Sequence, residues 1–276
     1  MLVFGHPDDE SHLAGSTIAK YSAEGAEVVV VIATRGEAGE IAPGVDATAE
    51  NLGEIREAEL RASVAVAGAS LELLDYRDSG MEGTPENEDP RAFVQAPEDE
   101  VVGTLVSLMR KYRPHVVVTF DENGGYGHPD HKFISKTTTG AFLASGDTGR
   151  AHTEGLPPWT PSKLYYMGFP RSRIKRFIEE YVKIKPDNDF RDIDPEKMGI
   201  PDEQFTTRLD VAEYVSVRRE AASKHRTQGS PFDMFPEAMQ EEVFGNDYFV
   251  LVHPSRDGER TNNLETDLFE GLDGLA

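Results

Sequence analysis

The run VVVVIA at residues 28–33 has six consecutive apolar side chains, five of them β-branched. A second run, VVVTF at residues 116–120, is nearly as apolar. A strand with one wet face alternates apolar and polar residues, whereas a strand of a parallel sheet is covered on both faces and is apolar throughout. The two runs therefore predict strands of a buried, mainly parallel sheet.

Shorter apolar runs predict further strands at Leu2–Phe4, Leu71–Leu74, Leu164–Met167 and Tyr248–Val252. Stretches with helical spacing lie between them, at residues 11–25 (with Ser11 as the N-cap), 51–68, 98–112 and 209–225. This alternation predicts an α/β fold, a Rossmann-like three-layer α/β/α sandwich with a mainly parallel sheet. We expect one domain over residues 1–276, with a core at 1–145, a part completing the sheet and pocket at 146–255, and a loose acidic tail at 256–276.

Composition limits the function. The 276 residues include no cysteine, so any metal must be bound by His, Asp or Glu. The net charge of −22 argues against binding to nucleic acid or to an anionic membrane. The chain lacks a signal-peptide pattern and a long apolar run, which predicts a cytoplasmic protein. We expect a small-molecule partner, and the sequence leaves homo-oligomer formation open.

Two long stretches have the composition of loops. Residues 82–100 are rich in proline and carry seven acidic side chains, and residues 145–162 are rich in Gly, Pro, Ser and Thr. Long loops often form the walls of active sites, although a solvated surface insertion is equally compatible with this composition. We expect residues 82–100 to line the substrate pocket and to influence specificity more than the fold.

The ionisable residues collect directly after the predicted strands. The segments that follow them include GHPDDE (residues 5–10), TRGEAGE (34–40), YRDSGM (76–81) and DENGGYGHPDH (121–131). The carboxyl ends of parallel strands share one edge of the sheet, where ligand sites of open α/β folds lie. The sequence therefore predicts a site built from these segments.

Two of these segments carry potential metal ligands: His6, Asp8, Asp9, His128, Asp130 and His131. Two histidines and one carboxylate form a set that binds Zn²⁺ or Fe²⁺ and leaves positions open for water and substrate. One of the adjacent aspartates can bind the metal while the other accepts a proton from water. Each motif alone is also compatible with simple helix capping, but both motifs at strand ends favour a metal site.

HPDDE after an N-terminal strand, with HPDH after a later one, resembles the LmbE-like / PIG-L superfamily of metal-dependent de-N-acetylases. RDSGM (77–81), RPHVVVTFDENGGYGHPDH (113–131) and KHRTQ (224–228) are similar to the mycothiol branch. That branch contains the deacetylase of an N-acetylglucosaminyl-inositol and the mycothiol S-conjugate amidase. Leu13 departs from the amidase pattern, in which this position carries a lysine.

The resemblance implies a role for each matching residue. The implied ligands of Zn²⁺, with Fe²⁺ as the alternative metal, are His6, Asp9 and His131. Asp8 matches the general base that activates water. His128 matches the histidine that stabilises the oxyanion or protonates the leaving amine.

Four further residues match the family pattern. Asp130 is implied to orient a histidine, and Tyr126 to polarise the amide carbonyl. Arg56 and Asp78 match residues that grip the substrate. The expected activity is therefore removal of an acetyl group from an N-acetylglucosamine-containing small molecule. An amidase of mycothiol-type S-conjugates is the alternative, and a non-catalytic sugar-binding module is a remoter one.

Overall fold

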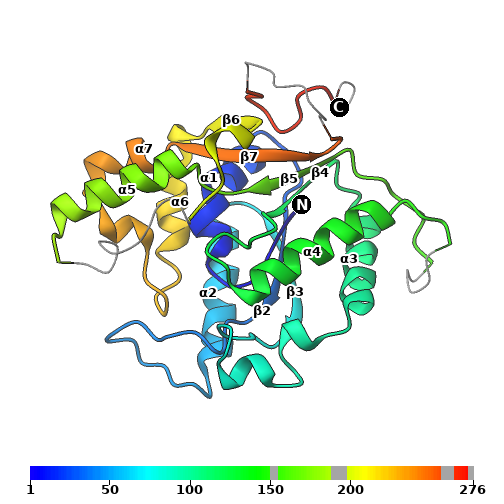
Figure 1. Cartoon of the computed structure of the whole chain (residues 1–276), viewed down its shortest axis with the longest axis horizontal. Coiled ribbons are helices and arrows are strands. Elements are labelled where there is room, and N and C mark those ends of the chain that lie inside the picture. Colours follow the sequence, from blue (N-terminus) through cyan, green and yellow to red (C-terminus); the bar gives the residue numbers. More distant parts are fainter. Residues whose placement is uncertain (150–154, 188–197, 256–263, 273–276) are drawn as a thin grey trace.

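The computed structural model describes residues 1–149, 155–187, 198–255 and 264–272. Its seven-stranded sheet has the order β3-β2-β1-β4-β5-β7-β6 (Figure 1). The strands are β1 Leu2–Phe4, β2 Val29–Thr34, β3 Ser70–Tyr76, β4 Val116–Phe120, β5 Lys163–Met167, β6 Thr207–Asp210 and β7 Asn246–His253. The first five pair in parallel, and β7 is antiparallel to both β5 and β6. The predicted mainly parallel sheet is confirmed.

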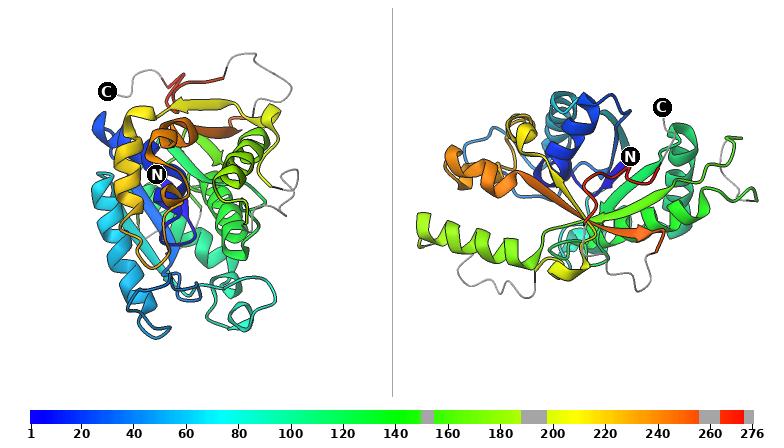
Figure 2. Two further views of the ribbon diagram at one scale, coloured as in Figure 1. Left: turned by 90° about the vertical axis from the view of Figure 1, so that its left-hand side faces the viewer. Right: turned by 90° about the horizontal axis from the view of Figure 1, so that it is seen from above.

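Helices cover both faces of the sheet. They are α1 Asp9–Ala23, α2 Leu52–Val66, α3 Glu98–Tyr112, α4 Pro129–Ala144, α5 Arg171–Ile184, α6 Val215–Ala222 and α7 Glu237–Phe244. Helices α1, α2 and α6 pack together on one side, and α3 and α4 on the other (Figure 2). This is the expected three-layer α/β/α sandwich. Among the described residues, no helix is both long enough and apolar enough to cross a membrane.

The core of the sheet is formed by the two apolar runs from which the sheet was predicted, residues 28–33 and 116–120. Every residue of β2 and of β4 is buried, and Val30, Val31 and Val117 are fully inaccessible to solvent. Neighbouring β1 is buried along its whole length as well. Burial on both faces explains why these strands contain almost no polar residue.

Two predicted helix boundaries are wrong. The helix expected to begin at Leu209 begins at Val215, because residues 207–210 form β6. In β6, buried and exposed side chains alternate, and Leu209 pairs with Asp247 of β7. Helix α1 begins at Asp9 rather than after Ser11, because the carbonyl of Asp8 accepts hydrogen bonds from the N–H groups of Ser11 and His12.

Residues 82–100 contribute to the core, contrary to the expectation that they matter little for the fold. Phe93 is fully buried, and its ring lies 5.0 Å from those of both Tyr76 and Phe133. The backbone of Ala92 pairs with that of Arg77, next to β3. This segment is therefore anchored by apolar packing on both sides of Phe93.

The described part of the predicted loose tail, residues 264–272, is packed against the sheet. The Glu265 carboxylate is buried and accepts hydrogen bonds from Lys163 (3.1 Å), Tyr165 (2.6 Å) and Thr207 (2.9 Å). Leu268 is also buried. The expectation of a loose tail is wrong here, because the Glu265 carboxylate binds the buried ammonium group of Lys163 and two hydroxyl groups. Residues 256–263 and 273–276 lie outside the described residues.

Candidate active site

The two histidine motifs meet between β1 and β4, where the order in which the strands follow one another across the sheet reverses. From β1 the chain passes through α1 to β2 and then β3 on one side of the sheet, whereas β4 and β5 follow on the other side of β1. The turn at residues 5–8 follows β1 and the loop at 121–128 follows β4. Crevices at such switch points are the usual ligand sites of open α/β sheets.

Two imidazoles face each other at the centre of this crevice. Nδ1 of His6 lies 3.0 Å from Nε2 of His131. The opposite nitrogen of each ring meets an oxygen acceptor, because His6 Nε2 lies 3.1 Å from Asp130 Oδ2 and His131 Nδ1 lies 3.2 Å from the Gly124 carbonyl. Those two nitrogens therefore carry the protons, and in neutral rings the facing nitrogens present lone pairs to each other. A cation shared between the two nitrogens, either a proton on His6 or a metal ion, relieves this repulsion.

The Asp9 carboxylate completes a set of three donors. Its Oδ2 accepts the N–H groups of Gly5 (3.1 Å) and His6 (2.7 Å), while Oδ1 lies 3.4 Å from His131 Nε2. Ligands about 2.0–2.2 Å from a tetrahedral zinc lie roughly 3.3–3.5 Å apart. Burial raises the pKa of Asp9, but the His131 imidazole outweighs this effect and the pKa falls to about 2. Asp9 thus lies beside the two imidazoles, and its place as the third metal ligand stays a prediction.

His128 lies beside His6, Asp9 and His131, and its free nitrogen is Nε2. Its Nδ1 accepts the backbone N–H of Asp130 at the start of α4, so that the neutral ring carries its proton on Nε2. One nitrogen of each of His6, His128 and His131 lies within 4.8 Å of the others, so His128 is a geometric alternative as third ligand. Burial and the neighbouring His6 lower the pKa of His128 to about 4. His128 is thus a neutral hydrogen-bond donor at neutral pH.

Asp130 and Asp78 support His6 from the other side of its ring. Asp130 is fully buried, and its Oδ2 also accepts the N–H of Ser79 at 3.0 Å. Asp78 Oδ1 lies 3.5 Å from His6 Nε2. Burial lowers the pKa of His6, but the hydrogen bonds to Asp130 and Asp78 outweigh it and hold that pKa well above its usual value. When the ring is neutral, this arrangement places its proton on Nε2 and leaves Nδ1 free to bind a metal.

Asp8 occupies a strained position between the strand and α1. Its φ of 112° and ψ of −32° are rare for a residue with a side chain, and such conformations cost about 1–3 kcal/mol. Burial, followed by the charge of Asp9, raises the pKa of Asp8 to about 8. Its Oδ2 lies 3.5 Å from Nδ1 of His12. Asp8 is therefore a carboxylate suited to exchange protons near neutral pH.

Sequence reasoning missed the residues that brace this turn. The N–H of Asp8 donates to Glu10 Oε2 at 3.0 Å, and Glu10 Oε1 lies 2.7 Å from His225 Nε2 and accepts Ser63 Oγ at 2.6 Å. Gln228 donates to the Pro7 carbonyl. Glu10 and His225 are each only 1% exposed. The KHRTQ segment contained the signal, but no local pattern indicates which acidic residue His225 meets.

Gly124 allows the loop after β4 to approach His131. Its φ is +66°, and a Cβ atom there would lie 2.7 Å from the Cβ of His131. The His131 ring stacks at 4.0 Å on that of Phe120, the last residue of β4. Glycine at position 124 is therefore required both by the left-handed turn and by the close contact.

Two further predicted site residues are Tyr126, which lies next to the histidines, and Arg56, which is buried under the loop after β2. Tyr126 is 61% exposed, and its ring lies 5.1 Å from that of His131. Arg56 is 4% exposed and donates to the carbonyls of Gly36 and Glu40 and to the Thr227 hydroxyl. Arg56 thus supports the loop after β2, and its contact with substrate stays a prediction.

Comparisons with known proteins identify the family of this chain. Residues 1–142 match the family model described as "PIG-L: GlcNAc-PI de-N-acetylase". A curated relative from Thermomonospora curvata, "1D-myo-inositol 2-acetamido-2-deoxy-alpha-D-glucopyranoside deacetylase", is 37% identical over 100% of this chain and 97% of its own length.

Solved structures share the fold at lower identity. The N,N'-diacetylchitobiose deacetylase of Pyrococcus horikoshii has a TM-score of 0.63 at 21% identity, covering 93% of this chain and 87% of its own. GalB, the 4-carboxy-2-hydroxymuconate hydratase of Pseudomonas putida KT2440, has the same TM-score at 16% identity, covering 95% and 98%. A deacetylase and a hydratase on one fold show that the fold alone does not define the reaction. The relative that matches over the full length and the family model define the reaction more closely. The chain belongs to the PIG-L family of GlcNAc-PI de-N-acetylases.

Proposed function

We propose that this chain hydrolyses the N-acetyl group of an N-acetylglucosamine conjugate, with N-acetylglucosaminyl-inositol as the first candidate substrate. The facing lone pairs of His6 Nδ1 and His131 Nε2, 3.0 Å apart beside Asp9, carry the proposal. We propose these three side chains as the ligands of Zn²⁺, with Fe²⁺ as the alternative. When bound there, the ion polarises the acetamide carbonyl and makes water more acidic.

Asp8 is the proposed proton carrier. The raised pKa of about 8 makes the ionised Asp8 carboxylate a stronger base, which can accept the proton of the attacking water and return that proton to the departing amine. Water adds to the amide carbon, the C–N bond breaks, and acetate and the free amino sugar leave. The hydrogen bond from the Asp8 N–H to Glu10 holds the backbone of Asp8 in the turn.

Neutral histidine and tyrosine donors are proposed to stabilise the negative charge that develops on the carbonyl oxygen. His128 presents Nε2–H because its Nδ1 is occupied by the Asp130 N–H. The exposed Tyr126 lies next to the same rings and can supply its hydroxyl. Preorganised donors of this kind are typically worth about 10²–10³ in rate each.

The proposed sugar contacts belong to the rim of the crevice. Asp78 lies 4% exposed between His6 and the loop after β2, and it accepts the N–H groups of Ala38 and Gly80. Together with Arg56 it positions that loop. The cytoplasmic location expected from the sequence stays a prediction.

The test is amine release from three substrates measured side by side: N-acetylglucosaminyl-inositol, free N-acetylglucosamine and a mycothiol-type S-conjugate. The protein is used with and without one equivalent of zinc, and metal content is measured by elemental analysis. We expect release from the inositol conjugate and one metal per chain. Preference for the S-conjugate would instead identify the amidase, and binding without turnover would identify a non-catalytic module.

A further inference from the structure

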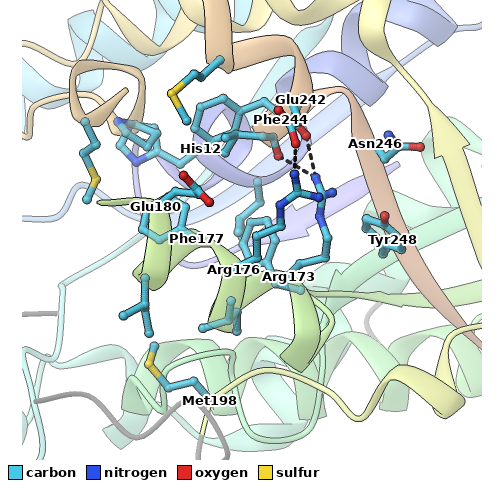
Figure 3. A pocket seen from close by; sticks show the side chains of 18 of the residues that line it. His12, Arg173, Arg176, Phe177, Glu180, Met198, Glu242, Phe244, Asn246 and Tyr248 are labelled. Carbon is cyan, nitrogen blue, oxygen red and sulfur yellow. Dashed lines mark hydrogen bonds and ion pairs between the residues drawn. The ribbon is translucent and has the colours of Figure 1, made fainter. Parts of the chain in front are cut away.

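A cavity of about 540 Å³ lies beside the candidate active site. Helices α5 and α7 form much of its wall, and Figure 3 shows Phe177 of α5 opposite Phe244 of α7. Two further lining residues, His12 and Tyr126, belong to the segments that carry the site. His12 Nδ1 lies 3.5 Å from Asp8, and the Tyr126 ring lies 5.1 Å from that of His131. A group in this cavity is therefore close enough to belong to the molecule that reacts.

The cavity presents mainly carbon atoms. Its apolar lining includes Leu13, Phe169, Ile174, Phe177, Met198 and Phe244. None of the side chains of α5, a helix described throughout, is fully buried, although Ile174 and Phe177 line the cavity. An apolar group placed here would remove this surface from water, which is the main source of affinity in such pockets.

The charged side chains in the wall already have partners elsewhere. Arg173 and Arg176 both turn toward Glu242, as the dashed lines of Figure 3 show. Glu180 pairs with Lys183 on its own helix. Arg176 and Glu180 are thus paired with side chains of opposite charge, whereas Arg173 donates to the backbone carbonyls of Glu242 and Val243.

Arg218 is another charged residue of the wall that is held by the protein. It is 1% exposed, pairs with Asp247 at 3.2 Å, and donates to the backbone carbonyls of Ser11 and His12. Its guanidinium therefore supports α1 from behind. The cavity is left with an apolar character, and it lies next to a crevice that takes a polar sugar.

We propose that this cavity holds an alkyl or aryl group attached to the amino sugar whose N-acetyl group enters the metal crevice. The inference rests on the proposed deacetylase function and adds an apolar substituent that N-acetylglucosaminyl-inositol, the first candidate substrate, does not carry. Leu13 of α1, five residues after Asp8, is an apolar wall residue close in sequence to the catalytic motif. Substrates that carry only polar rings leave this surface uncovered.

The test compares methyl and hexyl 2-acetamido-2-deoxy-glucopyranosides as substrates of the zinc-loaded protein. Each methylene that becomes buried contributes about fourfold in kcat/KM. With three of the five additional methylenes buried, the hexyl glycoside exceeds the methyl glycoside roughly 50-fold, mainly through a lower KM. Hexyl and methyl glucosides, which lack the acetamide, are compared in parallel by calorimetric titration.

Two lysine variants locate the effect. Leu13→Lys introduces a charge into the cavity wall, and we expect it to reduce the hexyl-to-methyl ratio at least tenfold. Leu143→Lys is the matched control, because Leu143 is 65% exposed on α4 and does not line the cavity, so the ratio should stay unchanged. A ratio that falls equally in both variants contradicts the assignment.

The outcomes separate this inference from the proposed function. Equal kcat/KM for the two glycosides overturns the cavity assignment and leaves the deacetylase function standing. Hexyl glucoside that binds about 50-fold more tightly than methyl glucoside, without turnover of any acetamide, supports the cavity and overturns the function. Failure in both assays overturns both.

Discussion

Asp8→Asn should change the pH dependence of stability as well as the rate. In the metal-free protein the pKa of Asp8 is about 8 because of burial and the neighbouring Asp9. The unfolded chain releases this proton near pH 4, so the folded state retains a proton that the unfolded state has lost. Wild-type stability therefore falls as pH rises through this window, by about 1.4 kcal/mol per pH unit.

Asparagine does not titrate, so the variant escapes this loss. Between pH 5 and pH 7 the free energy of unfolding of Asp8→Asn should rise by about 2–3 kcal/mol relative to wild type. For a chain of this size that difference corresponds to roughly 5 °C in Tm. All other ionisable groups are common to the two proteins and their contributions largely cancel.

The assay is urea unfolding of both chelator-treated proteins at pH 5, 6 and 7. A matched measurement of turnover in the zinc-loaded proteins should show a loss of about 10²–10⁴, as expected for a general base. If the two stability curves run parallel with pH, Asp8 has an ordinary pKa and its proposed role is wrong. A variant that also loses its metal would place Asp8 among the ligands.

Three further changes test separate features. Asp9→Asn should reduce zinc content after dialysis, with activity partly restored by excess zinc; full metal retention would remove Asp9 from the ligand set. His128→Ala should keep its zinc while kcat falls about 10²–10³-fold, and loss of the metal in elemental analysis would identify His128 as a ligand. Arg218→Met leaves the buried carboxylate of Asp247 without its cation, which should lower the free energy of unfolding by about 3–5 kcal/mol in urea titrations. Adding Asp247→Leu should recover much of that loss, and no recovery would contradict the pairing.

The centre of the fold could be predicted because its strands are apolar on both faces. VVVVIA admits no other simple interpretation at its length, and β2 is buried throughout. Strand β6 could not be predicted in the same way. Its four residues TRLD fit the start of a helix as well as a short strand, and pairing with β7, 36 residues later, decides the outcome. Helix α5 is not among the helices predicted from the sequence, although Ile174 and Phe177 have helical spacing.

The site shows the same division between local and distant information. Gly5 to Asp9 form one turn, so the motif itself fixes how Asp9 meets the backbone N–H groups. The contact between Glu10 and His225 joins residues 215 positions apart. Ser79 reaches Asp130 across 51 positions. Such contacts depend on how the layers assemble, and one sequence does not reveal them.

The position of β7 has a consequence for synthesis on the ribosome. Because β7 lies between β5 and β6, an emerging chain that ends before Asn246 has an open edge at β5 and a finished β6 with no neighbour in the sheet. At about 5–20 residues per second, the nascent chain remains in this state for several seconds after β6 has been made. Exposed strand edges recruit other chains. A nascent-chain chaperone that covers this open edge should therefore raise the yield of correctly folded protein.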